Sequence, residues 1–266
     1  MARCLITGSH GLIGQALSRR LIKRGHKVLA LPRDWKVIPD FDWLFHLGAY
    51  GNHSNQTNTQ EIFRVNIVRT WQLLQATKSM KYKAFVNIST SSVNLPYQTF
   101  YSASKGATEL IIRAFINEYK LPIINVRPFS VYGEGEADFR LIPTIMRSIM
   151  QGKKIVVAPG YHDWIYVEDF IDALLLIVRK IKKTKGTTID VGTGIQYSNF
   201  AVLETSEKIA NHTASYNYTT QRIRPYDTDN WVADISFLTK LGWKPKHSLK
   251  DGLKETYKYY KSLYRV

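Results

Sequence analysis

A tyrosine and a lysine four residues apart have the spacing best suited to chemistry: Tyr101 and Lys105, in the segment FYSASKG. Four residues make about one helical turn, so a helix would place both side chains on one face. A lysine ammonium near a phenol lowers the pKa of that phenol, which lets the tyrosine exchange a proton near neutral pH. Just upstream, VNISTSSV (86–93) ends an apolar run in a cluster of hydroxyls, and one of these can hydrogen-bond a substrate carbonyl.

Three glycines near the start of the chain form a second pattern. Gly8, Gly11 and Gly14 stand in TGSHGLIGQ (7–15), directly after a strand-like apolar run and at the opening of a helical one. Glycine at such positions permits a tight turn, close approach of the backbone to a pyrophosphate, and close packing of helix on strand. The N-terminus of the helix then offers unpaired N–H groups to the phosphates. The sequence therefore predicts a bound dinucleotide.

The choice of dinucleotide depends on residues that follow about 20 positions later. An acidic residue there binds the adenine-ribose 2′-hydroxyl of NAD, whereas an arginine suits the 2′-phosphate of NADP. The segment LALPRD supplies both Arg33 and Asp34. Arg33 comes first, which favours NADP over NAD. The alternative is that Arg33 lies in solvent and has no part in the choice.

The elements that must position these residues alternate along the chain. Strands are expected at 3–7, 27–32, 42–48, 84–89 and 122–127, and helices at 12–24, 61–79 and 103–119. Such alternation is typical of a parallel sheet covered on both faces, so we predict an α/β fold with a Rossmann-type doubly wound parallel sheet. The last helix carries apolar residues at the spacing of one buried face. These are Ala107, Leu110, Ile111, Ala114 and Phe115.

Beyond Tyr132 the pattern loosens, and aromatic residues and turns become more frequent, as expected for a substrate-binding lobe. We predict a dinucleotide-binding domain at 1–132, to which residues 163–194 return. A smaller C-terminal substrate-binding lobe would then consist of 133–162 and 195–266.

Composition limits the possible functions. The 266 residues are 44% hydrophobic and include one cysteine, so the chain can fill a core but cannot form an internal disulfide framework. Neither a leader pattern nor an apolar run of membrane-spanning length is evident, which predicts a soluble, cytoplasmic protein without a membrane partner. A net charge of +16 is also a feature of nucleic-acid-binding proteins, but the lysines are dispersed, and RKIKKTK (179–185) is typical of a solvated helix end. We expect neither a nucleic-acid partner nor a metal.

Taken together, the motifs resemble those of the extended short-chain dehydrogenase/reductases, the group of nucleotide-sugar epimerases, dehydratases and reductases. The resemblance covers nearly the whole chain. The matching segments, in the family's order, are TGxxGxxG at 7–14, DWLFHLGA at 42–49, VNIVRTWQLLQA at 65–76, Tyr101 with Lys105, VRPFSVYGEG at 126–135, DWIYVEDF at 163–170, DVGTG at 190–194 and ADISFLTKLGWKPKHSLKDGL at 233–253.

The resemblance implies roles for the residues that match. Ser91 would polarise the substrate carbonyl, Tyr101 would be the general acid/base, and Lys105 would bind the nicotinamide ribose and tune the tyrosine. Asp169 and Asp234 are expected to fix backbone turns. The residues implied to contact the cofactor are Gly8, Gly11, Leu12, Ile13, Gly14, Arg33, Leu47, Gly48, Ala49, Asn66, Tyr101, Lys105, Pro128 and Ser130.

Three further residues are candidates for substrate contacts. Arg224 matches a family arginine on the substrate diphosphate, and its alternative is a surface arginine. His162 stands where the family has another arginine, and its alternative is a hydrogen-bonding surface histidine. Ser92 is a second candidate for the hydroxyl beside Ser91.

Three departures from the family pattern narrow the function. About ten residues separate Arg33 from the next strand, which predicts a sheet that lacks one edge unit and a more open adenine pocket. The segment between Ser91 and Tyr101 is shorter than in relatives. The family's 4,6-dehydratases carry an Asp-Glu pair just after the catalytic hydroxyl, but here Ser92 and Val93 follow, so a dehydratase is disfavoured.

The reaction predicted on these grounds is the NADPH-dependent reduction of a nucleotide-linked keto sugar, best matched by a 4-keto-6-deoxyhexose. A nucleotide-sugar epimerase that keeps NAD tightly bound uses the same residues and is the nearest alternative. A non-catalytic cofactor-binding sensor is the alternative of another class. By analogy with the family, a homodimer is expected to form through the 61–79 and 103–119 helices.

Overall fold

The computed structural model describes residues 1–53 and 55–264, and the chain forms two compact units. Unit 1 comprises Met1–Pro128 and Ile171–Asp190, and unit 2 comprises Phe129–Phe170 and Val191–Val266. Each unit is described by itself below. No helix in the described ranges is long and apolar enough to cross a membrane.

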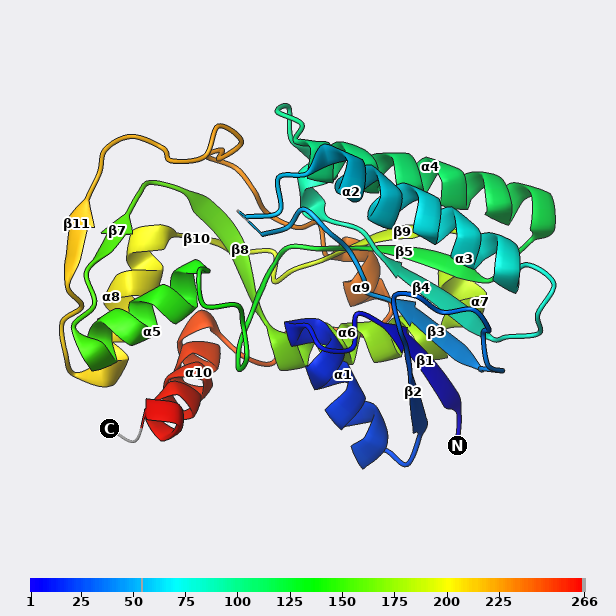
Figure 1. The fold of residues 1–266 in the computed structure, drawn as a ribbon. Helices are drawn as coiled ribbons and strands as arrows, with labels where there is room; N and C mark the ends of the chain where they lie inside the picture. Colours follow the sequence, from blue (N-terminus) through cyan, green and yellow to red (C-terminus); the bar gives the residue numbers. More distant parts are fainter. Residues whose placement is uncertain (54, 265–266) are drawn as a thin grey trace. The chain divides into compact units, whose positions relative to one another are not determined.

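Unit 1 is built on a six-stranded sheet in the order β2-β1-β3-β4-β5-β9 (Figure 1). Neighbouring strands pair in parallel from β2 through β5. The strands are β1 (Arg3–Thr7), β2 (Lys27–Leu31), β3 (Trp43–His46), β4 (Ala84–Ile88), β5 (Ile123–Pro128) and β9 (Thr188–Val191). The first five lie where the apolar runs predicted strands. All five residues of β4 are buried, as expected for a central strand with helices on both faces.

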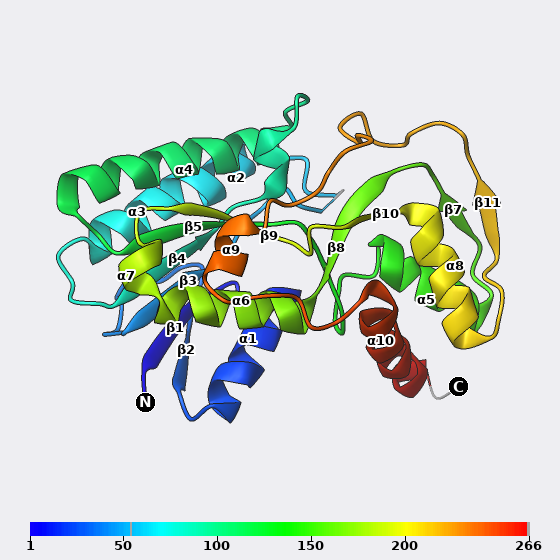
Figure 2. The same cartoon turned by 180° about the vertical axis from the view of Figure 1, so that it is seen from behind.

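Helices cover both faces of this sheet, so the predicted doubly wound α/β fold is confirmed. In both views α2 (Thr59–Phe63), α3 (Arg69–Thr77) and α4 (Phe100–Tyr119) lie on one face (Figures 1 and 2). On the other face lie α1 (Leu12–Lys23) and α6 (Val167–Arg179), the latter beginning in unit 2. The short α7 (Ile181–Thr184) follows α6.

The expected loss of one edge unit is confirmed. From β2 the chain runs to β3, which pairs on the other side of β1, and β2 is the edge strand of the sheet as described for residues 1–53 and 55–264. The short segment after Arg33 leaves no length for a further helix and strand before β3 begins at Trp43.

The helix predicted at 61–79 is interrupted. Residues 59–77 form α2, a π-helical turn η1 (Arg64–Val68) and α3 without a break in the chain's course. A π-helical turn inserts one extra residue, which rotates the side chains that follow it. Periodicity alone does not reveal such an insertion.

The buried face predicted for α4 was wrong in part. Phe115 is buried, but Leu110 is 63% exposed and Ala114 is also exposed. The core side of α4 instead includes several buried polar and charged residues, among them Lys105, Thr108 and Glu109. Apolar spacing therefore identifies only part of the inner side of this helix, since Ile112 and Phe115 lie in the core but Leu110 does not.

Unit 2 contains a three-stranded sheet, a two-stranded sheet and a group of helices. The first sheet has the order β10-β8-β6, and the second pairs β11 with β7. Helices α5, α8 and α10 are in mutual contact. The elements are β6 (Ser130–Tyr132), α5 (Leu141–Gln151), β7 (Ile155–Val157), β8 (Tyr161–Tyr166), β10 (Gln196–Ser198), α8 (Asn199–Ala210), β11 (Tyr216–Tyr218), α9 (Ser236–Lys240) and α10 (Leu249–Tyr264).

Candidate active site and cofactor cradle

The strand register of unit 1 brings three loops to one edge of the sheet. Thr7 of β1 pairs with His46 of β3, and His46 pairs with Asn87 of β4. The glycine loop, the 47–49 segment and the serine cluster therefore start at the same level. The carboxyl edge of a parallel sheet is where α/β proteins bind their ligands.

The glycine loop is shaped by two close approaches of backbone to backbone. Gly8 has φ +69°, and a Cβ placed there would lie 2.7 Å from the backbone nitrogen of Gly48. A Cβ on Gly14 would clash with the Gly8 carbonyl, so the start of α1 is pressed against the loop. Both positions require glycine, as the sequence pattern predicted.

The start of α1 fits the phosphates of a dinucleotide. Gly11 is the N-cap residue, and no side chain in the described part of the chain caps the helix there. The N–H groups of the first turn, at Leu12, Ile13 and Gly14, have no intrahelical acceptor because a helix leaves its first amides unpaired. Together with the helix dipole, they suit an anionic group.

His46 holds the 47–49 segment against β1. Its Nδ1 lies 2.7 Å from the Thr7 hydroxyl and its Nε2 lies 2.9 Å from the Thr70 hydroxyl. Thr70 donates its own proton to the Asn66 carbonyl, so the His46 Nε2–H must donate to Thr70, and Nδ1 accepts from Thr7. Thr7 in turn accepts the Gly48 N–H at 3.0 Å. Burial, aided by the Lys105 charge, lowers the pKa of His46 to about 3, and the ring is neutral.

Asn66 lies in the π-helical turn and is buried. Its amide nitrogen donates to the Tyr50 carbonyl at 2.8 Å and to the Ser104 hydroxyl at 2.9 Å. Its amide oxygen accepts the Tyr50 N–H at 2.8 Å. These contacts tie the segment after Ala49 to α4, and they engage an amide that the resemblance implied for the cofactor.

Ser91 begins a 3₁₀ turn, η2 (Ser91–Asn94), that leaves the end of β4. It is buried, and η2 lies in contact with α4. Ser92 is engaged with Thr90, whose hydroxyl oxygen lies 2.7 Å from that of Ser92. The Gln98 amide closes the segment by donating to the Leu95 carbonyl at 2.5 Å.

Tyr101 and Lys105 stand one turn apart at the start of α4. The helix begins at Phe100 because Thr99 and Ser102 form a reciprocal capping box. Lys105 is only 2% exposed, and burial lowers its pKa to about 8, while the nearby Glu109 carboxylate opposes this shift. Because this pKa lies close to neutral pH, small changes in the surroundings of Lys105 can change its protonation.

Glu109 and Arg127 were not among the residues predicted from the sequence. Arg127 donates from Nε and Nη2 to the two carboxylate oxygens of Glu109, at 2.9 and 2.6 Å. The Ser89 hydroxyl donates to the same carboxylate at 2.5 Å. The available signal was the position of Glu109, four residues after Lys105 and eight after Tyr101 on one helix.

The remaining predicted cofactor contacts occupy loop or strand-end positions. Arg33 is exposed and follows β2, and its charge is felt by Glu61 at the start of α2. Leu47, Gly48 and Ala49 follow β3, and Pro128 closes β5. Ser130 begins β6 of unit 2.

In unit 2, the structure places the two predicted substrate contacts within electrostatic reach of each other. His162 is buried in β8, and its ring lies 5.0 Å from that of Trp231. Burial lowers the pKa of His162 to about 4, helped by the charges of Arg224 and Arg140. The histidine is therefore neutral near pH 7 and offers a hydrogen bond where the family has a cation.

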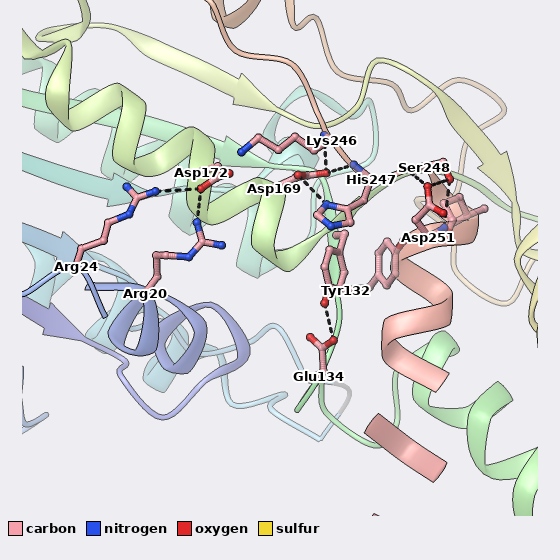
Figure 3. A network of polar contacts seen from close by, with 12 residues as sticks. Arg20, Arg24, Tyr132, Glu134, Asp169, Asp172, Lys246, His247, Ser248 and Asp251 are labelled. Atoms are coloured by element: carbon pink, nitrogen blue, oxygen red, sulfur yellow. Dashed lines mark hydrogen bonds and ion pairs between the residues drawn. The ribbon is translucent and has the colours of Figure 1, made fainter. Parts of the chain in front are cut away.

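Two aspartates fix backbone, as predicted. The Asp169 carboxylate accepts the N–H groups of Lys246 and His247 and the imidazole of His247 (Figure 3). Asp234 accepts the Ser236 N–H at 2.9 Å. Asp163 in β8 also fixes backbone, because it accepts the N–H groups of Thr193, Gly194 and Ala233.

Comparison with known proteins finds relatives that match along nearly the whole chain. CDP-abequose synthase of Salmonella muenchen is 27% identical over 95% of this chain and 96% of its own length. dTDP-glucose 4,6-dehydratase of Haemophilus influenzae is 25% identical, with 98% of each chain covered. The crystal structure of UDP-glucuronic acid 4-epimerase from Bacillus cereus with UDP-glucuronic acid and NAD has a similar fold. Its TM-score is 0.87 at 24% identity, and 98% of this chain and 99% of that one are covered.

A family model matches nearly all of unit 1 together with the 129–170 segment of unit 2. It is described as the NAD-dependent epimerase/dehydratase family, and it matches residues 4–192, from β1 to the residue after β9. This range includes the glycine loop, the serine cluster and the Tyr101–Lys105 pair. The resemblance inferred from the motifs is confirmed, and the chain belongs to the NAD-dependent epimerase/dehydratase family.

Proposed function

We propose that the protein reduces the keto group of a nucleotide-linked 4-keto-6-deoxyhexose. The observation that carries this proposal is the serine turn beside α4. It offers Ser91, in contact with the helix that carries Tyr101 and Lys105. The next two positions, however, are Ser92, which is hydrogen-bonded to Thr90, and Val93. An acid and a base for eliminating water are thus missing at the two positions where the dehydratases carry them.

The chemistry gives each of three side chains its own role. The reduced nicotinamide, when bound, supplies the hydride. Ser91 donates a hydrogen bond to the carbonyl oxygen, and Tyr101 gives that oxygen its proton as the carbon is reduced, so the product is an alcohol. Lys105, as an ammonium, favours the phenolate that Tyr101 becomes and also binds the nicotinamide ribose.

We propose that residues of unit 1 bind the cofactor and that residues of unit 2 bind the nucleotide-sugar. The glycine loop and the start of α1 would hold the pyrophosphate, and Arg33 would bind the 2′-phosphate of NADP. Arg224 would bind the substrate diphosphate, with the neutral His162 as a hydrogen-bonding partner. A nucleotide-linked substrate is supported by the names of relatives such as CDP-abequose synthase and dTDP-glucose 4,6-dehydratase.

We also propose a homodimer. The outer sides of α2–α4 carry large exposed apolar side chains: Phe63, Trp71, Phe100 and Leu110. In Figures 1 and 2, α3 and α4 lie side by side on one face of unit 1, so a second copy of this face would bury both helices.

The test is consumption of NADPH, with NADH in parallel, against 4-keto-6-deoxyhexoses linked to CDP, dTDP, UDP and GDP. Oxidation of NADPH with one of these sugars, and formation of a 4-hydroxy product by NMR, would establish the reductase. Absence of oxidation with all of them, from protein that is purified with NAD bound and interconverts sugar epimers, would replace it by the epimerase. Binding of cofactor without turnover of either kind would indicate a sensor.

A further inference from the structure

A two-bond ion pair outside the catalytic trio joins α4, which carries Tyr101 and Lys105, to β5. Glu109 is 5% exposed and stands on α4, one turn beyond Lys105. Its carboxylate receives both Nε and Nη2 of Arg127, which lies near the end of β5. Two parallel N–H···O bonds fix orientation as well as distance.

The same pair reaches both sides of Ser91. The Ser89 hydroxyl, two residues before Ser91, donates to Glu109 at 2.5 Å. Arg127 Nη1 donates to the Asn94 side-chain oxygen at 3.1 Å, and Asn94 ends the turn that Ser91 begins. The segment that carries Ser91 is therefore held at both ends by side chains that are anchored to α4.

We propose that Glu109 is a positioning residue: through Arg127 and Ser89 it sets the place of Ser91 relative to α4, and from its place one helical turn after Lys105 it supplies the countercharge of that ammonium. This inference rests on the proposed roles of Ser91, Tyr101 and Lys105, but on no particular sugar or nucleotide.

The charges that face Lys105 favour this second role. Glu109 lies on its own helix, His46 faces it from β3, and Tyr101 stands one turn earlier. His46 is neutral, so Glu109 is the anion that opposes the effect of burial on the lysine. Removing the carboxylate charge would leave Lys105 with burial and the cation of Arg127, both of which favour the neutral amine.

The first experiment needs neither substrate nor cofactor. The full chain, labelled with ¹³Cε-lysine, is titrated by NMR, and the Lys105 signal is identified by its loss in Lys105→Met. In Glu109→Gln, which keeps the size of the side chain, the pKa of Lys105 is expected to fall by about 1 or more. In Arg127→Lys, which keeps a cation but not the fork, it is expected to stay within about 0.5 of the wild-type value.

The second experiment separates positioning from mere stability. Both variants are expected to lose at least about tenfold in kcat with KM within about threefold, and Glu109→Gln alone is expected to move the alkaline limb of the kcat profile to lower pH. Asp172→Asn is the matched control, because Asp172 pairs with Arg20 and Arg24 in the same unit (Figure 3). The side chains of Asp172 and Arg20 are 15% and 23% exposed, close to the 6% and 22% of Glu109 and Arg127.

The control variant is expected to lower the melting temperature without changing kcat by more than about twofold or the Lys105 titration. If Glu109→Gln titrates like the wild type and loses no more activity than Asp172→Asn at equal loss of stability, the proposal is wrong. If Glu109→Gln does not fold, Arg127→Lys still tests the positioning role by kcat, and Glu109→Asp, which keeps the charge, must keep the titration. Failure of the wild type to reduce any keto sugar would count against the proposed function and leave the lysine titration to decide this inference.

Discussion

The hydroxyl of Thr7 and the imidazole of His46 form a 2.7 Å hydrogen bond that joins the end of β1 to the end of β3. Because the Thr70 hydroxyl is already a donor, the ring must accept from Thr7, and only the neutral form of His46 can do so. A buried histidine is often suspected of acid–base catalysis. Here both of its nitrogens are used to hold the ends of β1 and β3 and the Thr70 side chain together.

This arrangement predicts a pH dependence of stability. Burial lowers the pKa of His46 to about 3 in the folded state, against about 6.5 when unfolded. Below pH 6.5 the unfolded chain binds the proton and the folded chain does not, so stability is lost as the pH falls from 6.5 towards 3. His46→Gln is expected to lower the free energy of unfolding at pH 7.5 by about 1–3 kcal/mol, and to make its drop between pH 7.5 and 5.5 smaller by about 1 kcal/mol.

Urea unfolding at the two pH values measures both effects. The buried His162 also contributes to the wild-type pH dependence, so the comparison is with the wild-type slope and not with zero. The exposed His10→Gln serves as control and is expected to change neither quantity. An unchanged slope in His46→Gln would show that His46 takes up its proton at the same pH in the folded and the unfolded chain, so that folding does not hold it neutral.

Two glycines with positive φ allow the cost of backbone strain to be distinguished from the cost of a steric clash. Gly8 and Gly25 both have positive φ, +69° and +76°, but a Cβ on Gly25 meets nothing within 4 Å while one on Gly8 meets Gly48. Gly25→Ala is expected to lower the free energy of unfolding by about 1–2 kcal/mol, the cost of the left-handed conformation. Gly8→Ala is expected to lose about 1–3 kcal/mol more and to weaken dinucleotide binding, measured by nucleotide fluorescence, at least about tenfold. Equal behaviour of the two variants would contradict the close packing of the loop.

Local patterns were sufficient to predict β1 to β5 of the unit 1 sheet, but not β9. The strands from Arg3 to Pro128 are apolar runs bounded by turns, so each can be recognised from its own segment of the sequence. The missing edge unit was also predictable, because the chain length after Arg33 excludes it. The glycine pattern carries its own steric reason, which the structure shows at Gly8 and Gly14.

What escaped prediction depends on partners distant in sequence. Leu110 looked buried because it is apolar, yet Glu109 beside it is the buried residue, since Arg127 and Ser89 satisfy its carboxylate. Asn66 lies in the π-helical turn and contacts Tyr50 and Ser104. The spacing of residues near Asn66 does not predict these contacts. Polar residues with internal partners follow no hydrophobic period, so they become visible only once the fold is known.

Replacing Tyr101 by phenylalanine tests the proton donor. The phenol is the proposed source of the proton that the reduced oxygen receives, so Tyr101→Phe is expected to lower kcat by about 100-fold or more with little change in KM. Tyr119→Phe, at the exposed end of the same helix, is the control and is expected to keep wild-type rates. Steady-state kinetics decide the matter: turnover of more than a few per cent in Tyr101→Phe would remove the phenol from the mechanism.

Cofactor choice is expected to depend on Arg33. Its guanidinium is exposed after the edge strand β2, where it can bind a 2′-phosphate without first breaking a buried contact. Arg33→Ala is expected to raise the Kd of NADPH about tenfold or more and to leave that of NADH within about twofold. Lys36→Ala, an exposed cation three residues later, is expected to change both only slightly. Equal weakening of NADH and NADPH in Arg33→Ala would mean that the arginine does not read the 2′ position.

The last prediction concerns the outer side of α4. Leu110 is 63% exposed, and α3 beside it exposes Trp71, so a charge at this place would oppose a contact with a second copy without disturbing the core of unit 1. Leu110→Glu is expected to shift the protein from dimer to monomer by light scattering after gel filtration, with its melting temperature changed only by the loss of the partner.

Arg19→Glu makes a larger change of charge at an exposed position of α1, on the other face of the sheet, and it is expected to retain the dimer because it lies away from the proposed interface. A wild-type chain that is monomeric at all concentrations would overturn the dimer outright. A Leu110→Glu variant that remains dimeric would place the interface on another surface. In either case the apolar residues that first suggested a buried face of α4 would need a different partner.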